Sequence, residues 1–459
     1  MKTREEAFPM TEKRDLTKGN VTKVMLAFAW PMMLGNLLQQ VYNIADTWIV
    51  GRYIGTDALG AVGSAYTLMT FLTSVLIGLC MGSGGVFSFY FGKGETEHMM
   101  RSAYGAFVLI GGITLCISGL IFGTEDTILR LLQVPEELLP MMQEYVHTIF
   151  YGLVFVFLYN YFAYFLRAVG NSVVPLYFLG GTAVLNVGLD LFFVVALRLG
   201  VWGAAAATVL SQAVSGVGIG IYVWMKRERL GILSRHTGSF FNREIIGELL
   251  RFSLSTSLQQ SVMNFGILMI QGLVNSFGTT VMAAFAAAVK IDTFAYMPAQ
   301  EFGNAFSLFV SQNHGAGKKE RVKQGTRHAF CISVLFCLAV SAAVTLFAEQ
   351  WMGLFISPQE TAVLAVGKEY LWIEGTFYFG IGILFLLYGY YRGVNRPEIS
   401  LLLTVISLGS RVLLAYLLAP VEGIGVFGIW WAIPIGWILA DTVGIGLYKK
   451  YRFYIDRKE

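Results

Sequence analysis

The sequence predicts an all-α polytopic membrane protein, with twelve transmembrane helices in two parallel-repeat six-helix bundles. Of its 459 residues, 56% are hydrophobic and only 14% are charged, a balance too apolar for the surface of a soluble protein. Apolar runs long enough to cross a bilayer recur along the whole chain, and such runs form helices because lipid cannot satisfy the backbone of open strands. Short motifs also recur between the two halves.

Twelve apolar segments are predicted to be the transmembrane helices. The first, second and eighth are long and are interrupted by Gly, Pro or polar residues, so we expect them to be bent or tilted. Their approximate cores are residues 24–50, 59–90, 102–123, 144–166, 174–196, 200–225, 252–277, 281–313, 328–348, 370–391, 398–419 and 424–448.

The repeat is visible at a nearly constant offset. Gly55-Thr56 and Gly92-Lys93-Gly94 recur at offset 223 as Gly278-Thr279 and Gly315-Ala316-Gly317. An offset of 225 continues the match from Arg167/Arg392 to Gly203/Gly428. The glycine motifs lack phosphate-binding patterns and are interpreted as tight turns. Six helices per repeat give both halves one orientation, so a substrate cavity is expected between the halves.

Charge distribution predicts the domain boundaries and the orientation. We expect a cytoplasmic tail at 1–23, an N-lobe at 24–225, a cytoplasmic linker at 226–251, a C-lobe at 252–448 and a second cytoplasmic tail at 449–459. Of the 33 Lys and Arg residues, 27 then lie on the side of the termini and four on the other side. This bias predicts that both termini are cytoplasmic and that the protein resides in the plasma (cell inner) membrane. It also explains the net charge of +4 without a nucleic-acid partner.

The sequence contains no recognisable motif for a reaction. The four cysteines lie in apolar runs without CxxC spacing, so neither a disulfide framework nor a transition-metal site is expected. Residues 1–23 have basic residues but no apolar core, so they are not a cleavable signal peptide. We therefore predict neither an enzyme nor a cofactor.

Two acidic residues inside predicted helices are the main candidates for function. A carboxylate near the bilayer centre costs about 2.5 kcal/mol or more, so it is expected to face protein or water. Asp46 follows Tyr42 by four residues, and Asp190 follows Asn186 by four. Each acid therefore has the oxygen-bearing side chain of Tyr42 or Asn186 one turn away on the same face of its helix. Such a pair suits a hard cation or a shared proton. The alternative is that Asp46 merely touches water and Asp190 pairs with a neighbour.

The repeat helps to choose between these alternatives. At offset 223 Asp46 corresponds to Met269, and at offset 225 Asp190 corresponds to Ala415. If these acids only helped a bundle to fold, both halves would tend to need them, whereas one coupling site needs them once. Drift after duplication would leave the same asymmetry. Asn160 and Thr208 are predicted to supply further oxygens, and Pro31 is predicted either to allow gating or to be a passive kink.

The second half has its own polar residues in predicted helices, which either line a cavity or form a structural ion-pair network. Lys290 and Asp292 are two residues apart, so they point to different faces and do not pair directly. The candidates for the C-lobe cavity are Gln259, Gln260, Asn264, Lys290, Asp292, Glu301, Glu374 and Arg411.

Several stretches together resemble the multidrug and toxic compound extrusion (MATE) family. They are Trp30-Pro31-Met32-Met33-Leu34-Gly35-Asn36, Tyr42 with Asp46-Thr47, Gly51-Arg52, the paired Gly-x-Gly turns, Arg167 to Asn171, and Leu185-Asn186 with Asp190. The resemblance implies an antiporter that expels cationic or amphiphilic compounds against inward H⁺ or Na⁺. It is closer to the DinF-like branch than to NorM, because the seventh helix carries no acid. In that branch the matching N-lobe positions bind the coupling ion: Tyr42, Asp46, Asn160, Asn186, Asp190 and Thr208.

Two alternatives remain. A flippase of a lipid-linked precursor would belong to the same superfamily, but it is expected to have several cavity cations, and only Lys290 and Arg411 qualify. A polytopic membrane enzyme is a more distant alternative, disfavoured by the lack of metal-spacing clusters or a nucleophile motif. The expected partners are small organic molecules and the lipid bilayer, with no obligate protein partner.

Overall fold

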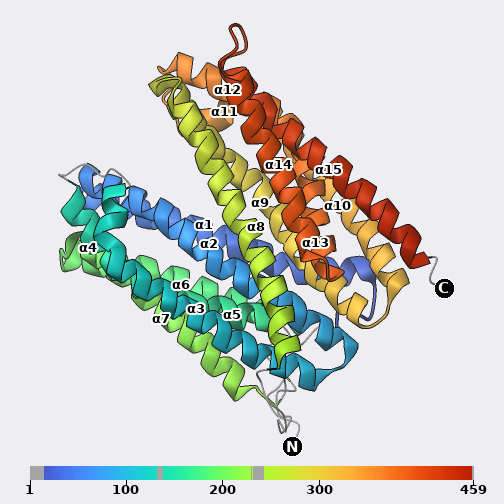
Figure 1. Ribbon diagram of the computed structural model, residues 1–459. Helices are drawn as coiled ribbons and strands as arrows, with labels where there is room; N and C mark the ends of the chain where they lie inside the picture. Colours follow the sequence, from blue (N-terminus) through green and yellow to red (C-terminus); the bar gives the residue numbers. More distant parts are fainter. Residues whose placement is uncertain (1–14, 132–137, 229, 231–241, 457–459) are drawn as a thin grey trace, which may run out of the picture. The chain divides into compact units, whose positions relative to one another are not determined.

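The computed structural model describes residues 15–131, 138–228, 230 and 242–456, and within these ranges the chain is helical, without strands. Residues 1–14 of the expected first tail, residues 229 and 231–241 of the expected linker, and residues 457–459 of the expected second tail lie outside the described residues. The chain forms two compact units (Figure 1). Unit 1 contains Trp30–Ser257, and unit 2 contains Gly19–Ala29 and the chain from Leu258 onwards.

Unit 1 is built mainly from the first seven helices and a short π-helix. Its elements are α1 (Val21–Tyr53), α2 (Thr56–Lys93), α3 (Thr96–Leu131), α4 (Leu139–Phe150), α5 (Leu153–Ala168), α6 (Val173–Asp190), η2 (Leu191–Ala196) and α7 (Gly200–Met225). The remaining elements, which build most of unit 2, are α8 (Arg243–Asn275), α9 (Thr279–Gly315), α10 (Lys319–Leu346), α11 (Ala348–Gly353), α12 (Thr361–Thr376), α13 (Tyr378–Gly393), α14 (Pro397–Leu418) and α15 (Val426–Asp456).

The fourth segment of each repeat is bent, which the sequence analysis did not predict. Instead of straight helices at 144–166 and 370–391, α4 and α5 meet at 42°, and α12 and α13 meet at 50°. The breaks fall at Gly152 and Phe377, which correspond to each other at offset 225. Neither break has a proline. A Cβ on Gly152 would lie 2.4 Å from the Gln212 side chain of α7, so tertiary packing fixes the first bend.

Nine single helices and the two bent pairs are long and apolar enough to cross a membrane among the described residues. The twelfth segment is α8. It begins at Arg243, well before the predicted core at 252. Its first turns carry charge, and the uncharged part that follows contains the polar residues Gln259, Gln260, Asn264 and Gln271, which lower its hydropathy. The short α11 is the remaining element and does not span.

The turns predicted from the repeat require unusual backbone angles at matched positions. Gly55 and Gly278 have φ of 129° and 93°, and Gly94 and Gly317 have φ of 80° and 69°. At offset 225, Gly170 is replaced by Asn395, which keeps a positive φ of 63°. Asparagine is among the few residues that tolerate this conformation. The repeat therefore preserves turn geometry as well as sequence.

Close backbone contacts hold the helices of each unit together. In unit 1 a Cβ on Gly78 would lie 2.4 Å from the Ser257 Cα, and Ser83 hydrogen bonds to Ser253 at 2.8 Å. In unit 2 a Cβ on Gly389 of α13 would lie 2.3 Å from the Gly303 carbonyl of α9. Small residues are typical of membrane interfaces because they let helices approach closely.

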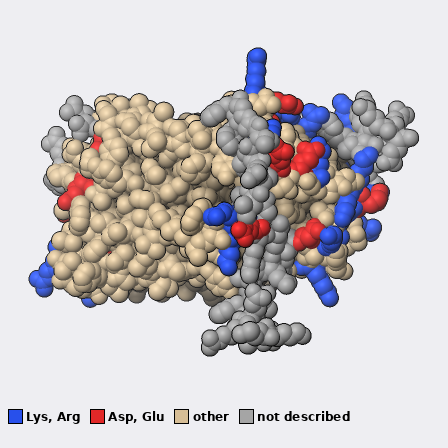
Figure 2. Space-filling view, turned by 90° about the horizontal axis from the view of Figure 1, so that it is seen from below, with Lys and Arg blue, Asp and Glu red and all other residues tan. Residues whose placement is uncertain are grey.

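The outer surface suits lipid. Figure 2 shows wide areas without Lys, Arg, Asp or Glu, while charged side chains gather elsewhere on the same face. Large apolar side chains are exposed, with Trp30 63% and Trp224 66% accessible. An aqueous surface rarely carries so much exposed apolar area.

Two helices pass from one unit to the other. Helix α1 belongs to unit 2 up to Ala29 and to unit 1 from Trp30, and Pro31 is the second residue after this boundary. Helix α8 belongs to unit 1 up to Ser257 and to unit 2 thereafter. In unit 2 the start of α1 is held by α10, where Thr22 hydrogen bonds to His328 at 2.8 Å. The proline is therefore located where α1 changes unit.

Candidate functional site

Two carboxyl groups, the half-buried Asp46 and the buried Asp190, face each other in unit 1. Asp46 in the second half of α1 lies within hydrogen-bonding reach of Asp190, the last residue of α6. Asp190 is fully buried. Asp46 Oδ1 and both carboxylate oxygens of Asp190 accept no hydrogen bond from any described residue. Two ionised carboxylates repel at this separation, so the pair needs a shared proton or a bound cation.

The neutral residues predicted to accompany this pair have the following contacts. Asn186, one turn before Asp190, donates from Nδ2 to Thr208 Oγ1 of α7 at 3.3 Å, and its own Oδ1 has no partner among the described residues. Tyr42 of α1 interacts electrostatically with Asp46. Asn160 instead donates to the Val156 carbonyl of its own helix at 2.9 Å. The structure thus brings together Tyr42, Asp46 and Asp190, and it joins Asn186 to Thr208 one turn before Asp190, whereas Asn160 is bonded separately.

A change in helix type follows directly after Asp190. The π-helical segment Leu191–Ala196 continues α6 without a break in the chain. Single π-helical turns are rare and are found frequently at functional sites, because they shift the side chains that follow and free a backbone carbonyl. The sequence analysis placed one regular helix over 174–196. Nothing in the residue types of this segment distinguishes a π-helix from an α-helix.

A second buried carboxyl pair lies in unit 2. Asp292 of α9 accepts hydrogen bonds from Tyr370 Oη at 2.6 Å and from Tyr378 Oη. Glu374, one turn after Tyr370 on α12, is adjacent to Asp292. The half-buried Arg411 of α14 interacts electrostatically with both acids. This cluster therefore contains a fixed positive charge and two hydroxyl donors.

The two clusters occupy related places in the repeat. Tyr145 corresponds to Tyr370 at offset 225, and Tyr145 interacts electrostatically with both Asp46 and Asp190. Asn186 corresponds to Arg411 at the same offset. Each unit thus positions a tyrosine and a polar residue of α6 or α14 against two acids, although the acids come from non-equivalent positions. The difference is that unit 2 supplies a guanidinium where unit 1 has a neutral amide.

The other predicted C-lobe residues are distributed more widely. Lys290 is exposed and lies 5.9 Å from the Phe355 ring. Glu301 accepts from Asn304 at 3.1 Å, and Asn304 accepts from Arg392 at 2.8 Å.

The three candidate amide residues on α8, Gln259, Gln260 and Asn264, have separate environments. Gln259 is buried, and its Oε1 has no partner among the described residues. Asn264 donates to the Gln260 carbonyl of the same helix at 3.2 Å. Of the eight candidates, the structure therefore brings together only Asp292, Glu374 and Arg411.

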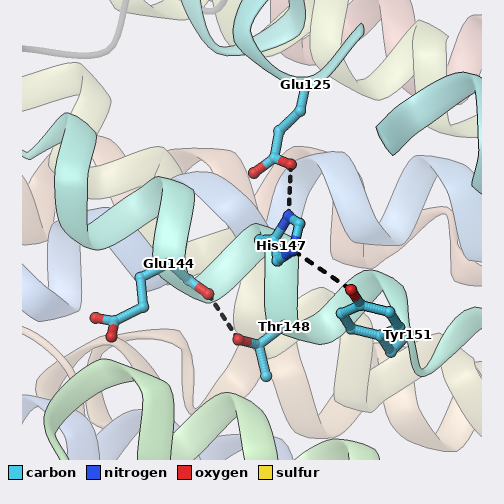
Figure 3. Close-up of polar contacts among 5 residues, drawn as sticks. All are labelled: Glu125, Glu144, His147, Thr148 and Tyr151. Atoms are coloured by element: carbon cyan, nitrogen blue, oxygen red, sulfur yellow. Dashed lines mark hydrogen bonds and ion pairs between the residues drawn. The ribbon is translucent and has the colours of Figure 1, made fainter. Parts of the chain in front are cut away.

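A third ionisable cluster joins α3 and α4 in unit 1 (Figure 3). His147 Nδ1 lies 2.9 Å from Glu125 Oε2, and His147 Nε2 lies 3.5 Å from the Tyr151 hydroxyl. Glu125 is buried, whereas the His147 side chain is half exposed. No role was assigned to His147 from the sequence. The Glu125 contact comes from a different helix, so spacing along one helix does not reveal it.

The tyrosines are the main residues that the sequence analysis missed. The chain has 22 tyrosines, and most residues of this type in a membrane helix face lipid or the apolar core. One feature of the sequence could have indicated a polar role for Tyr370: it lies four residues before Glu374 and hence on the same helix face. Tyr145 could have been identified by its match to Tyr370 at offset 225.

Comparison with known proteins gives consistent results over most of the chain. A model of the MatE family matches residues 31–192 and 254–417. The chain is 32% identical to the probable multidrug resistance protein YpnP of Bacillus subtilis, over 86% of this chain and 87% of the relative. It is 26% identical to the probable multidrug resistance protein NorM of Thermotoga maritima, over 89% and 88%. A structure of an outward-facing multidrug resistance MATE family transporter aligns with a TM-score of 0.90 and 25% identity, over 98% of this chain and 99% of the other.

Proposed function

Because this chain belongs to the MatE family of multidrug transporters, we propose that it is a cation-coupled efflux antiporter for cationic or amphiphilic small molecules. The resemblance inferred from the sequence is thereby confirmed, as are the two six-helix repeats of the fold. The exchanged ion is H⁺ or Na⁺, and the site at which it binds is the carboxyl pair of unit 1. No organic cofactor takes part in this function.

The observation that carries this proposal is the missing positive charge beside Asp46 and Asp190. Buried charges in proteins are normally paired or bound to a metal ion. The acids of unit 2 have Arg411, but no Lys or Arg among the described residues interacts with the acids of unit 1. A cation taken from solution supplies the missing charge. It can also leave again, which a covalently attached guanidinium cannot do.

Each residue around the pair has a separate role in this proposal. Asp190 and Asp46 bind the ion, while Asn186, Thr208, Tyr42 and Asn160 provide oxygens or orient those that do. Carboxylate, amide and hydroxyl oxygens are suitable ligands for Na⁺ and equally serve a bound proton. Pro31 lets α1 change shape where the helix passes from unit 2 to unit 1. Ion binding shifts the population between inward-facing and outward-facing states according to its different affinity for each.

We further propose that the protein lies in the plasma membrane with both termini in the cytoplasm. The excess of Lys and Arg on the side of the termini supports this orientation. Two relatives named as multidrug resistance proteins support small, chemically varied substrates.

The proposal is tested by dye transport in proteoliposomes under one imposed gradient at a time. Purified protein is reconstituted, and efflux of a cationic dye is recorded with a pH gradient alone and then with a sodium gradient alone. We expect one of the two gradients to drive dye movement against its concentration. If neither gradient changes dye movement relative to empty liposomes, the antiport proposal is wrong. As a control, dye efflux is recorded after a proton-conducting ionophore has dissipated the pH gradient, or a sodium-conducting ionophore the sodium gradient.

A further inference from the structure

Unit 2 contains a groove that the proposed transport function does not use. Its volume is about 720 Å³. It is formed by the first turns of α10, the second half of α13, the end of α15 and Phe306 of α9. The apolar lining includes Phe306, Ile383 and Leu387, and the basic lining is Lys323, Arg327 and Lys449. One acid, Glu320, also lines the groove.

The groove joins the apolar and the charged parts of the same helices. The candidate membrane spans of α10 and α15 run over Lys319–Leu346 and Val426–Lys450, so Lys323 and Lys449 lie near the ends of these spans. Phospholipid headgroups are found at this level of a membrane protein. The apolar residues of the lining continue from there toward the middle of the spans, where acyl chains lie.

The basic residues of the groove are largely available to a ligand. Arg327 and Lys449 are exposed, and neither forms an ion pair or hydrogen bond with another described residue. Lys323 lies 3.6 Å from Glu320, and both side chains are largely exposed to solvent, so this ion pair is weak. Three basic side chains therefore face the groove against a single acid that is already paired.

We propose that this groove binds one acidic phospholipid of the cytoplasmic leaflet. Its phosphate interacts with Arg327, Lys449 and Lys323, and an acyl chain follows the apolar wall of α13 and α9. Basic pockets between transmembrane helices on the cytoplasmic side are suited to anionic headgroups, and a zwitterionic lipid lacks the net charge to match them. The leaflet follows from the orientation proposed above, whereas the choice of an acidic lipid depends on the groove alone.

Binding in the groove has a structural consequence for α1. His328 also lines the groove, and it is hydrogen bonded to Thr22 in the first turn of α1. Near the start of α10, Arg321 Nη1 donates to the Gly19 carbonyl at 2.7 Å. A lipid that orders the first turns of α10 therefore stabilises the attachment of α1 to unit 2. We expect acidic lipid to raise the melting temperature of the protein as well as to bind it.

Lipid retention in native mass spectrometry tests the proposal. The protein is titrated with phosphatidylglycerol and, separately, with phosphatidylcholine of the same acyl chains. We expect one phosphatidylglycerol molecule to be retained in preference to phosphatidylcholine. The double substitution Arg327→Gln and Lys449→Gln lowers the affinity for phosphatidylglycerol about thirtyfold, equivalent to about 2 kcal/mol for two basic side chains near the surface.

Two further variants separate charge from shape. Ile383→Trp fills part of the groove without changing its charge, and we expect it to weaken phosphatidylglycerol binding as well. The matched control is Lys226→Gln with Arg227→Gln, which removes two basic residues at the end of α7 in unit 1. This control is expected to bind phosphatidylglycerol as the unchanged protein does. Melting curves in phosphatidylcholine nanodiscs establish that each variant is folded.

Three results would overturn the proposal. The first is equal retention of phosphatidylglycerol and phosphatidylcholine by the unchanged protein. The second is equal loss of binding in the groove variant and in the α7 control, which indicates general attraction to a basic surface. The third is displacement of the lipid by millimolar inorganic phosphate, which indicates an anion site without an acyl chain. None of these measurements depends on transport, so they remain valid if the antiport proposal fails.

Discussion

Replacing Asp190 with asparagine should separate ion coupling from folding and substrate binding. The substitution keeps the shape of the side chain and removes one of the two buried charges. With the charges about 4 Å apart and an effective dielectric constant of about 20, two carboxylates repel by about 4 kcal/mol. A proton or Na⁺ that binds between them relieves this repulsion. At about 1.4 kcal/mol per factor of ten, the pair therefore binds its cation about 10³-fold more tightly than a single carboxylate does.

We expect Asp190→Asn to abolish gradient-driven dye efflux in proteoliposomes, because the remaining Asp46 binds the ion too weakly. Exchange of labelled for unlabelled dye without an ion gradient should persist, since it does not require ion release. The melting temperature in detergent should stay unchanged or rise, because a buried charge without a donor has been removed. Dye fluorescence measures both transport modes, and intrinsic fluorescence during heating measures stability.

The matched control is Asp441→Asn in α15. Asp441 is also a buried acid with an oxygen lacking a partner among the described residues, but no second carboxylate is adjacent to it in the part of the chain that the structure describes. We expect this variant to retain gradient-driven efflux. If Asp190→Asn also retains efflux at the unchanged rate, the pair is not the coupling site. If both variants lose efflux and exchange, the effect arises from misfolding or from general loss of buried acids.

Three further substitutions test the units and their connection. Arg411→Gln leaves two buried acids without their fixed cation, so we expect unfolding to become easier by about 3 kcal/mol, measured by thermal melting. Pro31→Ala restores a backbone hydrogen bond worth about 1 kcal/mol, which favours the straight form of α1 about fivefold. We therefore expect dye efflux to slow. Ion binding, measured with ²²Na⁺ or by proton release, should be unchanged. Gly389→Leu forces a side chain against the Gly303 carbonyl, so little folded protein should be recovered in size-exclusion chromatography, whereas the same change at the open position Gly446 should be tolerated.

Periodicity and length predicted the helices well where hydropathy alone decides the boundary. The sixth predicted segment, 200–225, coincides with α7. The start of α8 was placed too late because Glu244, Glu248 and Arg251 interrupt the apolar run, although Glu248 is held by a hydrogen bond from Tyr90 at 2.8 Å. The bends at Gly152 and Phe377 were missed because neither has a proline, and the contact at Gly152 comes from Gln212 on another helix. Local sequence contains no information about such neighbours unless a proline is present.

The candidate site of unit 1 was predictable because an acid is costly in a membrane helix wherever it occurs. Spacing along one helix also predicted Tyr42 beside Asp46 and Asn186 beside Asp190. Spacing along one helix does not show that the two acids meet, because Asp46 and Asp190 lie far apart in the sequence, on different helices; their pairing was a hypothesis that the resemblance to the MATE family supported. The same reason explains why the tyrosine donors of Asp292 were missed.

The two carboxyl pairs change what the repeat implies about function. From the sequence, the absence of counterparts of Asp46 and Asp190 from the second half suggested that the coupling site lies in one half only. The structure instead gives each unit two acids and a repeat-matched tyrosine, Tyr145 or Tyr370. The decisive difference is then the positive charge. Unit 2 has Arg411 at the position where unit 1 has Asn186, so its two acids have a fixed cationic partner. The acids of unit 1 have no such partner among the described residues, and under the proposed function their positive charge comes from solution and can leave again, as coupling requires.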